Sequence, residues 1–286
     1  MTTQILVMGA LGNVGAEVVN SLLARGVQVR AAALSAEKVR ERFGPPVEAA
    51  AFDFAKPETF GPAFEGIRKM FLLRPPQISD VKKRMLPAIH AAQAAGVQHF
   101  VFLSIVGIEQ NTGVPHYKVE QHLRTCGAAY TFLRCSFFMQ NLNTLHRAEI
   151  RDRDEIYVPV GKARTSFIDV RDIGAVAALA LTQPGHENRA YDLTGCEALD
   201  YEQVAGLFTQ GLGRTITYKN PSGMQFFLRQ LQQGARLPFA LVTTWLYAKT
   251  RSGMADLVTG EVERLTRHTP IRMQQYIEDY RANWMR

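Results

Sequence analysis

The sequence predicts an α/β fold in which a doubly wound parallel sheet is covered by helices on both faces. Two observations predict it. Short, continuously apolar segments alternate with helical patterns through the first half of the chain. The glycine-rich segment Gly9–Gly15 also stands between the first apolar segment and the first helical pattern. Apolar strands separated by helices are typical of parallel sheets, and right-handed crossovers then give a doubly wound arrangement.

The expected strands of the first half are apolar runs, and the helices between them carry apolar residues three or four positions apart. The strands are Ile5–Met8, Val27–Ala33, Val47–Phe52, Ile67–Leu73, Gln98–Leu103 and Ala129–Leu133. The helices are Asn13–Ala24, Ala36–Phe43, Pro57–Phe64, Asp80–Ala95 and His116–Cys126. Glycine follows three of these helices, as is common at helix C-termini, at Gly26, Gly96 and Gly127.

The second half is less regular and predicts a smaller, α-rich C-terminal lobe. Strands are expected at Ser166–Ile168, Arg189–Leu193 and Thr215–Tyr218, and the pattern is helical from Met224, with breaks at Pro238 and Pro270. Asp172 is expected to cap a helix that runs to Leu181, and Asp200–Gln203 resembles a capping box that opens a helix to Leu212. The expected domains are a Rossmann-type, NAD(P)-binding domain over residues 1–155 with parts of 160–195, and a substrate lobe over residues 196–286.

The composition excludes several classes of protein. The 286 residues are 47% hydrophobic and 21% charged, which is typical of a soluble globular protein. No segment reaches the roughly 18 apolar residues of a membrane helix, and Ile5–Met8 is too short for a signal peptide, so we expect a cytoplasmic location. The net charge of +7 is dispersed, which argues against nucleic-acid binding. Three cysteines without metal-site spacing argue against disulfides and against a metal centre.

The glycine segment indicates a dinucleotide site. Gly9-x-x-Gly12-x-x-Gly15 follows a strand and opens a helix. In this pattern the first glycine permits the tight turn, the second lets the backbone approach a pyrophosphate, and the third lets the helix pack closely. The helix N-terminus adds free N–H groups and a positive dipole end. We therefore predict that Gly9, Ala10, Leu11, Gly12, Asn13 and Val14 bind the cofactor; the alternative is a tight turn without a ligand.

The end of the second strand favours NADP over NAD. An acidic residue there would bind the ribose 2′-hydroxyl of NAD, and the segment 30–38 has none before Glu37. Ser35, Lys38 and Arg30 are instead candidates for a 2′-phosphate. As alternatives, Lys38 is a solvated helix residue and Arg30 extends its side chain along the sheet.

Residues at the ends of later strands are further cofactor candidates. Asp53 and Phe54 end the third strand, where a carboxylate beside an aromatic ring suits adenine, although Asp53 equally suits a turn. The backbone at the end of the fourth strand is expected to pass the cofactor's ribose and phosphates. These candidates are Leu72, Leu73 and Arg74, with Ser104 at the end of the fifth strand.

Further motifs carry a family resemblance over residues 4–220. They are Gly9-x-x-Gly12-x-x-Gly15, Ala94–Ser104, His116-Tyr117-Lys118-x-Glu120, Tyr130–Arg134, Phe137–Leu142 and Phe167–Ile173. Together they resemble the NmrA-like group of atypical short-chain dehydrogenase/reductases. That group includes NADPH-dependent quinone and triphenylmethane-dye reductases, relatives of isoflavone reductase, and NADP-binding redox sensors without turnover.

The chain departs from the family pattern in two places. Leu34 stands where NADP-preferring members often carry Arg, which leaves NAD possible as a less favoured cofactor. The Tyr-x-x-x-Lys pair of ordinary short-chain dehydrogenases is absent, because Gln121 lies four residues after Tyr117. Lys118 follows Tyr117 directly, and the resemblance implies that this lysine contacts the nicotinamide ribose.

The resemblance and the residue chemistry together suggest catalytic and substrate residues. Lys118 is expected to bind the ribose and to stabilise a developing anion, and Tyr117 and His116 are candidate proton donors. Lys118 and His116 also have a plain surface interpretation. Phe137, Phe138 and Asn141 follow the sixth strand, where α/β sheets bind ligands, and are substrate candidates; the two rings equally suit a core. Core packing is also the favoured interpretation of four later aromatic residues, Phe226, Phe227, Trp245 and Tyr247.

The functional hypothesis is an oxidoreductase that moves hydride from NADP(H), or less favourably NAD(H), to a small-molecule acceptor such as a quinone or dye. The first alternative is an NADP(H)-binding redox sensor that contacts a protein partner. A sugar-nucleotide epimerase ranks lowest, because it normally needs the missing tyrosine–lysine pair. Neither a membrane nor a nucleic acid is expected as a partner.

Overall fold

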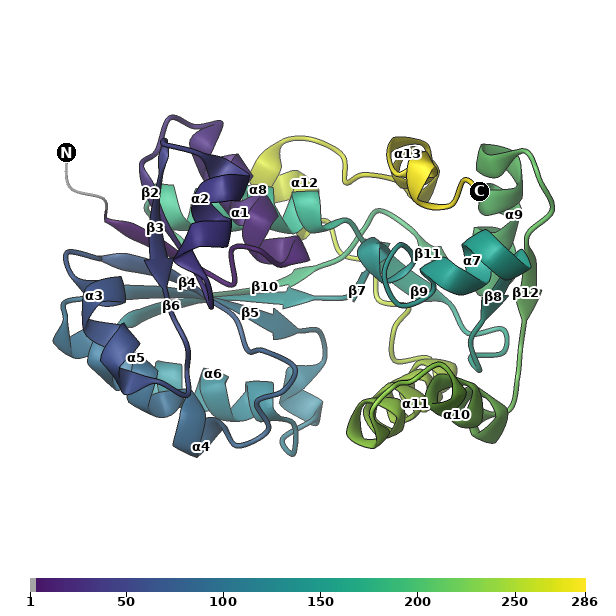
Figure 1. Ribbon diagram of the computed structural model, residues 1–286, viewed down its shortest axis with the longest axis horizontal. Helices are drawn as coiled ribbons and strands as arrows, with labels where there is room; N and C mark the ends of the chain where they lie inside the picture. The colour runs from purple at the N-terminus through teal and green to yellow at the C-terminus, as the bar shows by residue number, and fades with distance from the viewer. Residues whose placement is uncertain (1–3) are drawn as a thin grey trace. The chain divides into compact units, whose positions relative to one another are not determined.

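The computed structural model describes residues 4–286 (Figure 1). The chain forms two compact units. The first comprises Met1–Cys135, Val170–Leu193 and Glu261–His268, and the second comprises Ser136–Asp169, Thr194–Gly260 and Thr269–Arg286. This division differs from the expected boundaries, because residues 136–155 belong to the second unit and a late helix belongs to the first. The chain leaves the main sheet after Cys135, and Phe137–Phe138 pair with Phe167–Ile168 instead.

The first unit contains a seven-stranded sheet in which all pairs are parallel. Its order is β10-β6-β5-β4-β1-β2-β3. The strands are β1 (Ile5–Met8), β2 (Val29–Ala33), β3 (Val47–Ala51), β4 (Lys69–Leu72), β5 (His99–Ile105), β6 (Ala129–Cys135) and β10 (Arg189–Leu193). The predicted doubly wound fold is confirmed, with one more strand in the sheet than the first half supplies. The order reverses between β1 and β4, and ligands bind at such a switch point.

Helices cover both faces of this sheet (Figure 1). One face carries α1 (Asn13–Leu23), α2 (Ala36–Phe43), α8 (Val170–Thr182) and α12 (Glu261–Thr266). The other carries α3 (Phe60–Phe64), α4 (Val81–Arg84), α5 (Leu86–Ala94) and α6 (Pro115–Thr125), with short 3₁₀ turns at Pro57–Thr59 and Ile108–Gln110. A Cβ at Gly174 would lie 2.7 Å from the main chain of Glu17, so this glycine lets α8 approach α1 closely.

Two helix predictions were wrong in detail. The expected single helix Asp80–Ala95 is interrupted at Met85 and forms α4 and α5. Pro87 lacks the N–H that a continuous helix would direct at the Lys83 carbonyl, so the helix breaks there. Asp172 does not precede its helix, because α8 begins at Val170 and places this carboxylate in the first turn.

The second unit combines helices with two small sheets. One sheet has the order β11 (Ala198–Leu199), β9 (Thr165–Ile168), β7 (Phe137–Phe138), and the other pairs β12 (Thr217–Lys219) with β8 (Glu155–Tyr157). The helices are α7 (Arg147–Arg153), α9 (Tyr201–Leu212), α10 (Gly223–Gln232), α11 (Leu237–Arg251) and α13 (Met273–Asp279), with 3₁₀ turns at Met139–Asn141 and Arg281–Asn283. The predicted capping box at the start of α9 is confirmed.

Large aromatic side chains form the core of the second unit. Tyr201, Phe208, Tyr276 and Trp284 are fully buried there. The Trp284 indole donates to the Leu142 carbonyl at 3.2 Å, which ties the end of the chain to its middle. Within residues 4–286, no helix combines the length and the apolar character that crossing a membrane requires.

Candidate cofactor site

The turn between β1 and α1 depends on two glycines. Gly9 has φ +64°, a left-handed conformation that only glycine adopts readily. Its carbonyl oxygen accepts from the Gly12 N–H at 2.9 Å. A Cβ at Gly15 would overlap that same carbonyl, so a side chain at position 15 would push the helix away from the turn. These two glycines are explained by the fold itself.

Gly12 is not explained by the fold, and this points to a ligand. Its backbone is extended, with φ −84° and ψ 170°, which any residue adopts. A Cβ there would lie 3.3 Å from the Gly9 oxygen, a tight contact but a much milder one than the overlap that a Cβ at Gly15 would make with the same atom. The missing side chain instead leaves the outer surface of the turn open. A pyrophosphate approaching the backbone needs that opening.

The N-terminus of α1 is also arranged to receive an anion. Among the described residues, no side chain caps this helix. By contrast, Ser35 caps α2 and Asp80 caps α4 through their side-chain oxygens. The first-turn N–H groups of α1, including those of Asn13 and Val14, therefore lack side-chain acceptors. Together with the helix dipole they suit a phosphate.

A cavity of about 810 Å³ opens beside this turn. Its walls are the glycine turn, the ends of β2 and β3, and the segment that follows β4. The lining residues are Met8, Gly9, Leu11, Gly12, Ala32–Ser35, Lys38, Phe52–Ala55, Leu73, Pro75–Asp80 and Arg84. This volume lies within the range of cofactor pockets, roughly 300–1,000 Å³. Several predicted cofactor residues therefore meet at one cavity: Gly9, Leu11, Gly12, Ser35, Lys38, Asp53, Phe54 and Leu73.

Arg42 lies at the glycine turn, although sequence reasoning did not single it out. Its Nη1 donates to the Leu11 carbonyl at 3.1 Å. It stands one helical turn after Lys38, so both cations share a face of α2, and this i, i+4 spacing was the available signal. Leu34, in the place of the family's usual Arg, has 78% of its surface exposed.

Arg30 does not belong to this site. Its Nε donates to Glu48 Oε1 at 2.7 Å, and its Nη1 donates to the Ala63 and Glu65 carbonyls at 3.0 and 2.7 Å. The guanidinium therefore ties β2 to β3 and to the end of α3. The alternative interpretation, in which Arg30 extends along the sheet, fits these contacts better than 2′-phosphate binding.

Asp53 lines the cavity and also holds a turn. Its Oδ1 accepts from the Ala55 N–H at 2.8 Å, and its own N–H donates to Thr59 Oγ1 at 3.1 Å. Phe54 lies beside it, with its ring edge-on to Phe52 at 4.9 Å. Both interpretations of Asp53 are compatible with this arrangement.

Arg74 and His116 contact each other instead of lining the cavity of the described chain. The Arg74 Nε donates to His116 Nε2 at 3.4 Å, and its Nη1 donates to the Ile78 carbonyl at 2.7 Å. Burial, assisted by the Arg74 charge, lowers the pKa of His116 to about 3. His116 is therefore neutral near pH 7 and accepts a hydrogen bond, which argues against the predicted role as a proton donor. Arg74 shapes the segment after β4 that forms one cavity wall.

Leu72 and Ser104 do not line the cavity of the described chain, and their predicted contacts with the cofactor stay predictions. Leu72 is fully buried within β4. The buried Ser104 hydroxyl donates to Glu120 Oε1 at 2.6 Å, and the Arg134 guanidinium donates to both Glu120 oxygens at 3.1 and 2.8 Å. This network joins α6 to β5 and β6. Ala10 and Val14 are buried beneath the glycine turn.

Lys118 and Tyr117 lie on α6, which that network holds in place. Lys118 is exposed and Tyr117 is half-buried. Neither lines the cavity of the described chain. Their catalytic roles stay predictions.

The three predicted substrate residues belong to the second unit. Phe137 and Phe138 form β7 and are half-buried, and Asn141 ends the following 3₁₀ turn. The Phe137 ring lies 6.2 Å from that of Tyr247. The neighbouring Gln140 donates to Asp169 at 3.0 Å, so two of the family motifs bind each other.

The family model of the NmrA-like family matches residues 1–254. The chain belongs to this family. An NAD(P)H azoreductase of Xenophilus azovorans is 38% identical over 218 residues, 75% of this chain and 76% of that protein. A (4-alkanoyl-5-oxo-2,5-dihydrofuran-3-yl)methyl phosphate reductase of Streptomyces griseus subsp. griseus is 34% identical over 268 residues, 92% of each chain. The predicted family is thus confirmed.

A solved structure supports the fold. The Citrobacter sp. triphenylmethane reductase complexed with NADP(H) superimposes with a TM-score of 0.85 at 22% identity. The match covers 96% of this chain and 99% of that chain. The NmrA-like chain described here therefore has the predicted Rossmann-type fold.

Proposed function

We propose that this protein transfers hydride from NADPH to a conjugated small-molecule acceptor such as a quinone or a dye. The chain is an NAD(P)H-dependent reductase with NADP(H) as its cofactor, in agreement with the reductases named among its relatives. The finer assignment of the acceptor is supported by the azo and triphenylmethane compounds in two of those names. The observation that carries the proposal is the open turn at Gly12 beside the uncapped N-terminus of α1.

The residues around the 810 Å³ cavity would hold the cofactor. The first-turn N–H groups of α1 would bind the pyrophosphate. Lys38 and Arg42 would bind the 2′-phosphate in place of the usual arginine at position 34, because both cations lie on the face of α2 beside the turn. Asp53 and Phe54 would flank the adenine.

The reaction balances as a two-electron reduction. Bound NADPH supplies the hydride, and the acceptor takes this hydride together with one proton. Lys118 would orient the nicotinamide ribose and favour a developing oxyanion. Tyr117 is the remaining candidate proton donor on α6, because His116 is neutral and accepts from Arg74.

A titration with NADPH and NADH, followed by nicotinamide fluorescence, tests the proposal. A panel of quinones and dyes is then added to the complex. We expect tighter binding of NADPH than of NADH, and oxidation of the bound NADPH by at least one acceptor. Binding without oxidation by any acceptor would contradict the reductase and favour a redox sensor. The Gly12→Val variant should lose binding while it keeps its fold, because its side chain occupies the pyrophosphate approach.

A further inference from the structure

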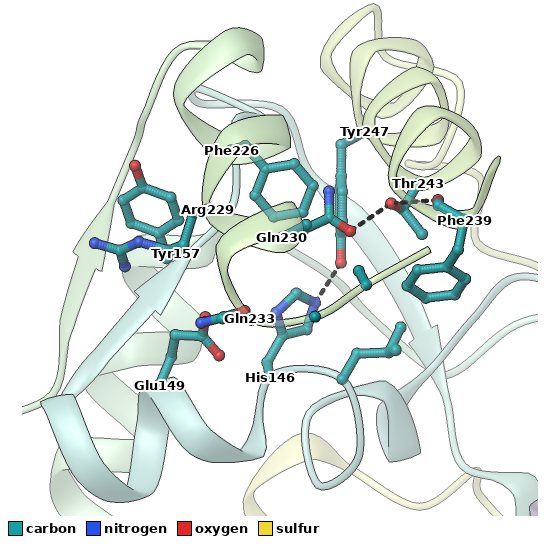
Figure 2. Close-up of a pocket in the computed structure, with 13 residues that line it drawn as sticks. His146, Glu149, Tyr157, Phe226, Arg229, Gln230, Gln233, Phe239, Thr243 and Tyr247 are labelled. Carbon is teal, nitrogen blue, oxygen red and sulfur yellow. Dashed lines mark hydrogen bonds between the residues drawn. The ribbon is translucent and has the colours of Figure 1, made fainter. Parts of the chain in front are cut away.

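A second cavity, of about 270 Å³, lies within the second unit. Figure 2 shows its walls, which come from α7, β8, α10, α11 and the segments that join them. The cofactor and acceptor roles proposed above assign no function to it. Phe226 and Tyr247 line it, although the sequence favoured plain core positions for both.

Aromatic rings form one side of this cavity. The rings of Phe226 and Tyr247 meet edge to face, with centroids 5.2 Å apart. Tyr157 stacks near Phe226 at 6.5 Å, and Phe239, which is 40% exposed, stands at the other end (Figure 2). Such a wall offers apolar aromatic surface to a ligand, and an aromatic ligand is stabilised there by ring contacts in addition to the burial of its area.

Polar side chains complete the lining of this cavity and are held in place by hydrogen bonds (Figure 2). His146 Nε2 lies 2.5 Å from the Tyr247 hydroxyl, and Gln233 Nε2 donates to Glu149 Oε1 at 2.6 Å. Thr243 donates to Gln230 Oε1 at 2.6 Å. The amide and hydroxyl groups of these side chains are therefore fixed before a ligand arrives, which lowers the entropic cost of binding.

The charges around the cavity disfavour an ionic ligand. Burial lowers the pKa of His146 to about 4, so its ring is neutral near pH 7. Burial raises the pKa of Tyr247, so its hydroxyl keeps its proton. Arg229 is paired with Glu155 and lies over the Tyr157 ring at 3.4 Å. An anion would meet the Glu149 carboxylate, and a cation would meet Arg229.

We infer that this cavity binds a flat, uncharged molecule of one or two aromatic rings that carries a hydrogen-bonding oxygen. The volume is just under the roughly 300–1,000 Å³ of pockets for drug-sized ligands, which excludes larger ring systems. The rings of Phe226 and Tyr247 contact the ligand's faces, and the amides of Gln230 and Gln233 reach its oxygen. The inference goes beyond the proposed function, because binding requires no electron transfer.

The test uses 2-naphthol, a fluorescent two-ring compound with one hydroxyl group, and the full-length protein without NADPH. We expect saturable binding to the unaltered protein. Ala235→Leu adds bulk to the cavity wall and should weaken this binding at least about tenfold. The matched control Ala248→Leu makes the same change at an exposed position of α11 outside the lining, and should bind normally.

Tyr247→Phe is a second, smaller change that tests the cavity in case Ala235→Leu disturbs the fold. The affinity of each variant for NADPH serves as its folding control. Tyr247→Phe keeps the ring and removes the hydroxyl that contacts His146, and should weaken binding about fivefold. No saturable binding to the unaltered protein would overturn the inference, as would equal affinities in Ala235→Leu and Ala248→Leu.

A competition experiment with 1,4-naphthoquinone decides whether the ligand of this cavity is the acceptor of the reaction or an effector. It should displace 2-naphthol from the unaltered protein, and failure to do so would count against the site. If Ala235→Leu also slows quinone-dependent NADPH oxidation, the occupant is the acceptor; if not, it is an effector. The 2-naphthol titration contains no NADPH. Its result therefore stays valid even if the proposed reductase activity is not observed.

Discussion

Under the proposed function, a single guanidinium takes the place of the arginine that NADP-preferring relatives often carry at the end of β2. Arg42 reaches the glycine turn from α2 and donates to the Leu11 carbonyl, while Leu34 points its apolar side chain into solvent. Lys38 lies on the same helix face and lines the cavity. Under the proposed function, the positive charge that binds the 2′-phosphate therefore lies on this helix and not at the end of the strand.

Arg42→Leu should therefore weaken NADPH binding about tenfold, which corresponds to about 1.4 kcal/mol. NADH binding should change less than about twofold, because NADH has no 2′-phosphate. Nicotinamide fluorescence measures both dissociation constants. Arg40→Leu removes a cation from an exposed position of the same helix and serves as the control. Equal losses for the two cofactors would mean that Arg42 only supports the turn.

The glycines of the turn predict two different phenotypes. Gly15→Ala places a Cβ against the Gly9 carbonyl and should lower the free energy of unfolding by about 1–3 kcal/mol. Gly12→Ala, at the first position before α1, should cost less than about 1 kcal/mol. Both should weaken NADPH binding. Denaturant unfolding measures the free energy of unfolding of each variant. Equal losses in the two variants would show that Gly12 also stabilises the folded protein.

At the scale of elements, hydrogen bonds between family motifs place the helices. Glu120 on α6 binds Arg134 on β6 and Ser104 on β5. Gln140 binds Asp169 just before α8. Ser104 was a cofactor candidate in the sequence, and the others were motif residues. In the structure the bonds of Glu120 fix α6, and with it Tyr117 and Lys118, against β5 and β6.

The wall of the second cavity depends on the start of α10. The Ser222 hydroxyl accepts from the Gln225 N–H at 3.2 Å, and Gln225 Oε1 accepts from the Ser222 N–H at 2.8 Å. Ser222→Ala removes one of these bonds and should cost about 1 kcal/mol of unfolding free energy. Ser222→Gly should cost only a few tenths. Denaturant unfolding measures both losses. A larger loss for Ser222→Gly than for Ser222→Ala would show that backbone flexibility at this position matters more than the cap.

The sequence predicted the sheet well because periodicity is local. Each strand of the first unit is a continuous apolar run, and each helix repeats its apolar residues within one turn. The interruption at Met85 and the strand Phe137–Phe138 were missed, since the first depends on one proline and the second on a partner strand distant in sequence. The expected domain boundaries also differ from the two units, because the chain leaves the main sheet after Cys135 and because Glu261–His268 returns to the first unit from far along the sequence.

The sequence predicted the candidate site only for residues that belong to a recognisable motif or end a predicted strand. The glycine turn and the residues that end β2 and β3 were found because parallel strands bring their carboxyl ends to one edge. Arg74, His116 and Ser104 share that edge, yet their side chains turn to each other or to Glu120. Which partner a side chain selects depends on contacts that no local pattern records.

For the whole molecule, buried histidines link stability to pH. Burial lowers the pKa of His99 and of His146 to about 4, and that of His116 to about 3. In the unfolded chain each would titrate near 6.5. Between these values the unfolded chain binds more protons than the folded protein, so folding becomes less favourable as the pH falls. This contribution to stability is complete above about pH 7 and declines down to about pH 4 for His99 and His146, and to about pH 3 for His116.

His99 offers the clearest test of this linkage. Its Nε2 lies 2.8 Å from Thr131 Oγ1, which itself donates to the His186 carbonyl at 2.7 Å. Its buried Nδ1 has no hydrogen-bond partner among the described residues, so a second proton there would be a buried charge that the attraction of Glu187 offsets only in part. Lys69 adds a repulsion of the same sign. His99→Gln keeps a side-chain donor for Thr131 and removes the titrating ring.

The free energy of unfolding should therefore fall less steeply with decreasing pH in His99→Gln than in the unaltered protein. From the shift of its pKa, His99 accounts for on the order of 1–3 kcal/mol of the decline between pH 7 and pH 4. Denaturant unfolding at several pH values measures this slope. His268→Gln replaces an exposed histidine and should leave the slope unchanged. Parallel slopes in the two variants would show that His99 takes up its proton in the folded state without cost, and that the acid sensitivity of the fold originates in other groups, His116 and His146 among them.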